Sequence, residues 1–223
     1  MLKAQKKLTK KRIKEDKLVT FYFKSQDFLK HNGRQILSGV GALMLVFLLA
    51  VIYKSKQGEK EHNAIVELTK AKLKYFENDY SAAVPILKNL IEEYGGTESG
   101  QEGRFYLANS FFNLGTFAQA EQYFNEFLKH DGDDILSASA MAGVAACLEE
   151  QKNYERAAKL YREAAEKYRN NFMTPQNLYN CARCYHLAGN PEEARRALTE
   201  LIEKYADASI KNEAELLLSE LTS

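Results

Sequence analysis

The amino-acid sequence predicts an all-α protein, in which one transmembrane helix precedes an α-solenoid of about four helix pairs and a C-terminal cap helix. Three observations support this fold class. An uncharged apolar run of 18 residues lies near the N-terminus. Pairs of alanines recur at a constant interval of 37 residues through most of the remaining chain. Basic residues are in excess before the apolar run, and acidic residues are in excess after it.

The apolar run extends from Ile36 to Tyr53 and contains no charged residue. At about 1.5 Å per residue, a helix of this length spans roughly 27 Å, close to the thickness of a membrane hydrocarbon core. A cleaved signal peptide is the main alternative. However, the preceding basic region is too long, and the following KSKQGEKEH offers neither a small-x-small cleavage site nor a lipid-accepting Cys. The run is therefore predicted to remain as a membrane anchor.

The charge distribution predicts the orientation of this anchor. Residues 1–35 contain eleven Lys and Arg against three Asp and Glu, a balance of +8, whereas residues 54–223 contain twenty against twenty-seven, a balance of −7. The excess of cations before the span places the N-terminus in the cytoplasm. The C-terminal part then lies across the membrane, which would be the periplasm if the membrane is a bacterial inner membrane.

The basic tail has a helical pattern of its own. Its apolar residues fall near one helical face with lysines around them; they are Leu18, Phe21, Tyr22, Phe28 and Leu29, beside Lys17, Lys24 and Lys30. A basic amphipathic helix suits the surface of an anionic leaflet. A solvated tail that only sets the topology is the alternative.

The repeat is carried by two columns of alanine. The first column is Ala71, Ala108, Ala145 and Ala182, and the second is Ala83, Ala120, Ala157 and Ala194. Two antiparallel helices approach closely only where a small side chain faces the partner, so each column marks one helix of a pair. Larger side chains recur four residues after the second column, at Leu87, Phe124, Tyr161 and Leu198. Gly115 and Gly189 suit the turn within a pair, and Pro191 suits the first turn of a second helix.

The segment LANSFFNLGTFAQAEQYFNEFL closely resembles the tetratricopeptide repeat, with its small, aromatic and Gly-containing positions in order. The resemblance covers about residues 62–205 and implies stacked helix pairs, although the period is 37 rather than about 34. Lys70 and Lys74 depart from it by filling usually apolar positions. The predicted organisation is a basic cytoplasmic tail, a transmembrane helix, a juxtamembrane linker, the repeats and a cap helix, at residues 1–34, 35–53, 54–62, 63–207 and 208–223.

No catalytic, cofactor-binding or metal-binding constellation is predicted. The four histidines are scattered, and the sequence contains no HExxH, P-loop or GxSxG motif. The motif CARC, at 181–184, lies inside a predicted first helix, without the strand-to-helix context of a redox site or a second pair of zinc ligands. Cys147 and Cys184 are 37 residues apart. The cysteines are therefore interpreted as small core residues, and the chain is not predicted to be an enzyme.

A solenoid binds partners on a concave face that its first helices build. By the register of the tetratricopeptide family, the candidate peptide-binding residues are Leu68, Lys72, Tyr75, Phe105, Asn109, Phe112, Glu149, Tyr179, Arg183 and His186, with Ala142 and Ala146 among them. Aromatic side chains separated by Asn and Arg suit an extended or helical peptide. The alternative is that some of these rings pack into the core.

Taken whole, the chain resembles the ancillary subunit of the bacterial Sec translocon, a family with a short cytoplasmic arm, one span and a periplasmic tetratricopeptide domain. The junction FLKHNGRQILSGVGALML is similar to that of the family. The resemblance implies a bacterial inner-membrane protein without a cofactor, whose partners are the Sec channel and periplasmic chaperones or secreted clients. Neither a nucleic acid nor a small-molecule substrate is expected.

Small residues at one end of the span could contact another membrane helix; they are Ser38, Gly39, Gly41 and Ala42. Two other functions fit the same architecture. One is an envelope scaffold for cell-wall, outer-membrane or motility assembly. The other is an organelle import receptor with cytosolic repeats, against which the charge asymmetry argues.

Overall fold

A computed structural model describes the backbone of residues 17–130 and 133–222, and the side chains from residue 21 onward within these ranges. The chain divides into two compact units, Met1–Lys56 and Gln57–Ser223, which are described separately. Residues 1–16 of the predicted cytoplasmic tail lie outside the described residues, as do the side chains of Lys17 and Leu18.

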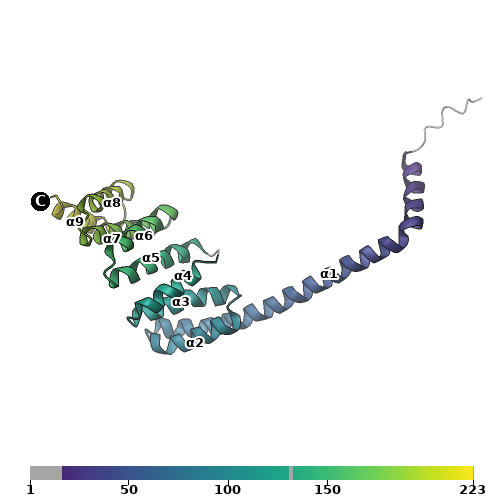
Figure 1. Ribbon diagram of the computed structural model, residues 1–223, viewed down its shortest axis with the longest axis horizontal. Helices are drawn as coiled ribbons and strands as arrows, with labels where there is room; N and C mark the ends of the chain where they lie inside the picture. The colour runs from purple at the N-terminus through teal and green to yellow at the C-terminus, as the bar shows by residue number, and fades with distance from the viewer. Residues whose placement is uncertain (1–16, 131–132, 223) are drawn as a thin grey trace, which may run out of the picture. The chain divides into compact units, whose positions relative to one another are not determined.

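The described residues form nine α-helices and no β-strand, which confirms the all-α class (Figure 1). The helices are α1 Lys17–Phe76, α2 Tyr80–Tyr94, α3 Glu98–Asn113, α4 Phe117–Phe127, α5 Asp134–Glu150, α6 Tyr154–Lys167, α7 Thr174–Leu187, α8 Pro191–Lys204 and α9 Lys211–Glu220. Helix α1 passes from the first unit into the second, and residues 54–62, expected as a linker, are helical.

The first unit consists of the N-terminal part of α1. It includes the predicted span, whose most apolar 18-residue window has a mean hydropathy of 2.6 and no buried residue. Within the described part of the chain, α1 is the one helix long and apolar enough to cross a membrane. The long apolar helix expected near the N-terminus is therefore present.

The second unit is a stack of helix pairs. The C-terminal part of α1 shares the hydrophobic core with α2 as a first pair, and three further pairs follow: α3 with α4, α5 with α6, and α7 with α8. Each helix from α2 onward packs on the next one in the chain, and α9 packs on α8 at the end (Figure 1). Because α3 also contacts α5, the first helices of neighbouring pairs lie side by side. This arrangement is the predicted solenoid with its cap helix.

The alanine columns occupy the closest contacts of this stack. All eight alanines have no exposed surface. The bulky residues that follow the second column are also buried, with Phe124 at 1% and Tyr161 at 3% exposure. The predicted helix-pair register is therefore confirmed.

A third column with the same interval lies at the turns within the pairs. Gly115 and Gly189 have φ angles of 74° and 78°, in the left-handed region that glycine tolerates. Asn78 and Lys152 occupy the equivalent positions, with φ angles of 60° and 62°. The sequence indicates Gly115 and Gly189 directly, and asparagine, as at Asn78, is also enriched in this region, whereas a lysine such as Lys152 gives no such indication.

The two unexpected lysines lie in the first helix of the stack. Lys70 shares its repeat position with Leu107, Val144 and Cys181, which are all buried. Lys70 is exposed instead and forms an ion pair of 2.7 Å with Glu67, while Lys74 pairs with Glu77 at 2.8 Å. In the later repeats, both positions are buried. Because the stack of the second unit starts at α1, here they form its polar end.

Candidate protein-binding surface

The candidate surface is built by the first helix of each pair: residues 57–76 of α1, then α3, α5 and α7. We call it the first-helix face. Nine of the ten candidate residues are at least partly exposed. Leu68 is the exception, because its side chain is 5% exposed and belongs to the hydrophobic core. Leu68 therefore supports this face from below and is not available to a partner.

Aromatic rings cluster on the part of the face formed by α1 and α3. The ring of Tyr75 lies 5.1 Å from that of Tyr106 and 5.4 Å from that of Phe76, in edge-to-face arrangements. Phe76 is 67% exposed, so the cluster offers apolar area to a partner. Such ring pairs hold one another in fixed positions, which lowers the entropy cost of binding.

Lys72 lies beside this cluster and is not a free cation. Its Nζ donates to Glu102 Oε1 at 2.9 Å and lies 4.9 Å from the centre of the Tyr106 ring. Partial burial opposes the positive charge, but hydrogen bonds to Glu102 and Tyr106 outweigh it and raise the pKa of Lys72. Lys72 is therefore charged at neutral pH and neutralised by a neighbour from the next repeat.

Phe105 and Phe112 belong partly to the core and partly to the surface. The Phe105 ring lies 5.7 Å from that of Phe127 and 6.0 Å from that of Phe124, while Phe112 lies 5.4 Å from Phe117. Both candidate rings are half-buried. Asn109 donates its side-chain amide to the Phe105 carbonyl at 2.9 Å, within the helix. These rings therefore pack against the core and keep part of their surface exposed.

The middle of the face has small side chains. Ala142 and Ala146 of α5 are half-buried, and Gly143 lies between them. A Cβ atom on Gly143 would approach Phe124 Cζ to 2.5 Å, so the Phe124 ring occupies the space that a side chain would need. This floor of small residues allows a partner to come close to the α5 backbone.

An ion pair joins α5 and α7 at the C-terminal end of the face. Arg183 donates two hydrogen bonds to the Glu149 carboxylate, one of them 2.8 Å from Nη2 to Oε2. Tyr161 reaches the same carboxylate at 3.5 Å. Tyr179 is half-buried against the core, whereas His186 is exposed. The predicted Glu149 and Arg183 thus lie together, with their charges paired.

Glu102, Tyr106 and Gly143 also belong to this face but were not among the candidates. The register could have included Tyr106 and Gly143, because they directly follow the candidates Phe105 and Ala142. Glu102 could not be recognised as the partner of Lys72 from spacing alone, because their separation of 30 residues does not match the period.

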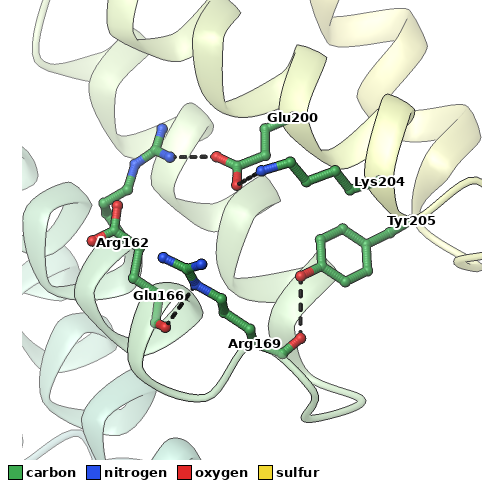
Figure 2. A network of polar contacts seen from close by, with 6 residues as sticks. All are labelled: Arg162, Glu166, Arg169, Glu200, Lys204 and Tyr205. Carbon is green, nitrogen blue, oxygen red and sulfur yellow. Dashed lines mark hydrogen bonds and ion pairs between the residues drawn. The ribbon is translucent and has the colours of Figure 1, made fainter.

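A second polar cluster lies on α6, α8 and the loops that follow them (Figure 2). Arg162 and Lys204 both donate to the Glu200 carboxylate, at 2.7 Å and 3.0 Å. Tyr205 donates to the Arg169 carbonyl at 3.1 Å. Burial opposes the charge of Glu200, but the hydrogen bonds from Lys204 and Arg162 outweigh it and lower its pKa. This cluster connects the third and fourth pairs.

The three cysteines are buried and have no exposed surface. Burial raises the pKa of Cys147 and Cys184 to about 12 and that of Cys181 to about 11. Thiols with such pKa values are almost entirely protonated at neutral pH and react slowly. These properties agree with cysteines that fill small core positions.

The candidate membrane contact lies in the first unit. Ser38, Gly39, Gly41 and Ala42 are exposed on α1. A Cβ atom added to either glycine would meet no atom within 4 Å, so nothing in the structure occupies this side of the helix. Ser38 Oγ donates to the Gln35 carbonyl at 2.8 Å, which satisfies the hydroxyl within the helix.

Stacked helix pairs with an aromatic and polar first-helix face define a repeat-built scaffold for protein interactions. The family described as the tetratricopeptide repeat-like domain matches residues 26–174, and a tetratricopeptide repeat family matches residues 148–212. The first match covers more than half of the chain, which therefore belongs to the tetratricopeptide repeat-like domain family. No curated protein matches the chain.

Several solved structures have the same fold. Nearly identical TPR-like repeats from Podosopora anserina match with a TM-score of 0.59 and 14% identity, over 71% of this chain and 85% of that one. Apo RapI matches with a TM-score of 0.62 and 14% identity, over 70% of this chain and 46% of its own. Desulfovibrio magneticus RS-1 MamA matches with a TM-score of 0.54 and 15% identity, over 71% and 94%. At these identities, the similarity establishes the fold, which is typically a non-catalytic scaffold for protein partners.

Proposed function

We propose that this protein is a membrane-anchored scaffold of the bacterial cell envelope, ancillary to the Sec translocon. Its N-terminus lies in the cytoplasm, and its repeats bind chaperones or secreted clients in the periplasm. The observation that carries the proposal is the order of the chain: a tail with a balance of +8, an uncharged span, and repeats with an acidic excess.

The anchor is supported by the exposed apolar surface of α1. The most apolar window is entirely exposed, and burying that much apolar area requires a membrane or a partner. The family match begins at residue 26, before the span, and therefore includes it. We propose the domain boundaries given above, with residues 54–62 as a helical connection to the repeats.

The first-helix face supports a peptide-like partner. Its aromatic rings are partly exposed and held in place by the core, and the floor at Ala142 and Ala146 is small. Its Lys72 and Arg183 side chains are both paired with carboxylates, so apolar contacts rather than net charge dominate recognition. Such a face fits an extended or helical segment with large apolar side chains.

The orientation is tested by limited proteolysis of intact inner-membrane vesicles and spheroplasts. Protease added to spheroplasts should degrade the C-terminal repeats and leave an epitope on the N-terminal tail intact. In inverted vesicles the result should be reversed. Digestion of the tail in spheroplasts would contradict the proposed orientation and the periplasmic function together.

The partners are tested by site-specific photo-crosslinking in native membranes. A crosslinker at Gly39 or Ala42 should capture a Sec channel component. One at Phe112 or Tyr179 should capture a chaperone or an emerging secreted chain. The double substitution Phe112→Ala and Tyr179→Ala, read with a crosslinker at Asn109, should abolish the second capture and leave the first. Recovery of only cell-wall, outer-membrane or motility proteins at all positions would reject the translocon and favour a general envelope scaffold.

A further inference from the structure

The N-terminal end of α1 has an exposed apolar face that the proposed anchor does not use. Phe21, Tyr22, Phe28 and Leu29 are each more than half exposed. At 3.6 residues per turn they lie within about 120° of the helix circumference. This face precedes the uncharged span, so a span of normal length leaves it outside the hydrocarbon core.

The opposite side of the same segment is basic, although it also carries the exposed Phe23. Lys24, Lys30 and Arg34 are exposed, and Asp27 is the one acidic residue of this stretch. Asp27 lies 3.6 Å from His31 Nδ1. A cationic helix beside a membrane span is complementary to anionic lipid headgroups, which attract juxtamembrane lysines and arginines.

The helix can change direction between this segment and the span. Asn32 Nδ2 donates to the Phe28 carbonyl at 3.3 Å, a side-chain contact that competes with the helical backbone pattern. Gly33 follows, and a Cβ atom there would meet nothing within 4 Å. Figure 1 shows α1 bent in its purple N-terminal part. Glycine and side-chain bonds to the helical backbone are recognised causes of such bends.

We infer that residues 21–32 form an interfacial helix that lies on the anionic leaflet from which the span begins. Phe21, Tyr22, Phe28 and Leu29 contact the acyl chains, and Lys24, Lys30 and Arg34 contact lipid phosphates. The bend at Asn32–Gly33 lets the span cross the membrane. This inference rests on the proposed membrane anchor and adds a lipid surface as the partner of the preceding segment.

The absence of Trp from the sequence allows a direct test. Single-tryptophan variants of the full chain are reconstituted into vesicles that contain phosphatidylglycerol and brominated acyl chains, which quench tryptophan by contact. Phe28→Trp lies on the apolar face. Phe23→Trp, about 160° from the centre of that face, is the matched control. Quenching should be severalfold stronger for Phe28→Trp than for Phe23→Trp.

The charge requirement is tested in the Phe28→Trp background. The pair Lys24→Glu and Lys30→Glu should reduce quenching to the level found in pure phosphatidylcholine vesicles. The same charge change at Lys54→Glu and Lys56→Glu, beyond the span, should leave it unchanged. Equal reduction by both pairs would overturn the headgroup contact.

A third reporter, Leu45→Trp, separates this inference from the proposed function. If Leu45→Trp is quenched but Phe28→Trp and Phe23→Trp are quenched equally, the anchor stands and the interfacial helix is overturned. If Leu45→Trp is not quenched, the anchor fails and the inference fails with it.

Discussion

Lys152 adopts a left-handed backbone conformation at the turn between α5 and α6, with a φ of 62°. The equivalent turns before α4 and α8 use Gly115 and Gly189, which tolerate this conformation without a Cβ clash. A non-glycine residue in this region costs roughly 1–2 kcal/mol. The turn keeps this conformation because the two helices that it joins pack closely at the buried Ala145 and Ala157.

We therefore predict that Lys152→Gly raises the free energy of unfolding by about 0.5–1 kcal/mol, since relief of the backbone strain exceeds the added entropy of the unfolded chain. Denaturant unfolding of the full chain, followed by circular dichroism, measures the change. Lys129→Gly, at an exposed lysine without a positive φ, is the control and should lower stability slightly. If both substitutions had the same effect, the strain at Lys152 would be disproved.

Glu200 gives a prediction about pH. Because its pKa in the folded protein is below its ordinary value of 4.5, its contribution is fully present above about pH 4.5 and is lost as pH falls through the folded pKa. Glu200→Gln should thus lower the free energy of unfolding at pH 7 by about 0.2–1 kcal/mol, and the difference should disappear at strongly acidic pH.

Paired denaturation curves at neutral and acidic pH measure this difference. Glu203→Gln, an exposed carboxylate on the same helix, is the control and should show a smaller difference at neutral pH. A constant deficit of Glu200→Gln at all pH values would show that lost packing, rather than charge, is responsible.

The helices, as elements, depend on close contacts at the alanine columns. Ala120 of α4 has no exposed surface, and Phe124 lies one turn later, with its ring against Gly143 of the next pair. One side chain of the wrong size therefore affects two pairs. In repeat proteins stability is shared between a unit and its neighbours, so a local defect weakens the adjacent interface as well.

We predict that Ala120→Leu destabilises the protein by about 1–3 kcal/mol, because the added methylenes have no space between the two helices. The melting temperature of the full chain should fall by several degrees. Ala118→Leu is a matched control on the exposed side of α4 and should change it little. Equal stability of the two variants would show that the helix-pair register is wrong.

Across the repeat stack as a whole, the ends differ from the interior. Lys70 and Lys74 fill positions that are buried in later repeats, and their pairing with Glu67 and Glu77 makes this end polar. Val66 and Leu73 remain partly exposed nearby. Solenoids need polar terminal surfaces, since an apolar end would stack on another copy.

We predict that the double substitution Lys70→Leu and Lys74→Leu promotes self-association. It would join Val66 and Leu73 into one apolar end surface with the shape of an inner repeat interface. Mass photometry of the full chain in lipid nanodiscs should detect a larger share of dimers than for the wild type at the same concentration. The pair Lys54→Leu and Lys56→Leu, outside the repeats, is the control. No shift in mass relative to that control would contradict the proposed role of the lysines.

The helix-pair fold and its register follow from the amino-acid sequence alone. The reason is physical: a small side chain is required wherever two helices meet closely, so the alanine columns indicate the packing directly, and their spacing was enough to place Ala71 and Ala83 at the helix contacts. The apolar run at residues 36–53 was equally clear, since no ordinary soluble helix lacks a polar face over that length. Gly115 and Gly189 indicated two of the four turns, because glycine readily adopts the left-handed conformation that these turns require.

Only the packing of the helices in three dimensions decides which side chains of the first-helix face are paired, buried or exposed. Lys72 pairs with Glu102 and Arg183 pairs with Glu149 at separations of 30 and 34 residues rather than 37, because a long side chain can reach a residue one or two helical turns from the equivalent position on the neighbouring helix. Leu68 occupies the same repeat position as residues that are partly exposed, but its own side chain packs into the core and is buried. Periodicity indicates where small side chains permit contact, whereas long polar side chains meet their partners only after the helices have packed.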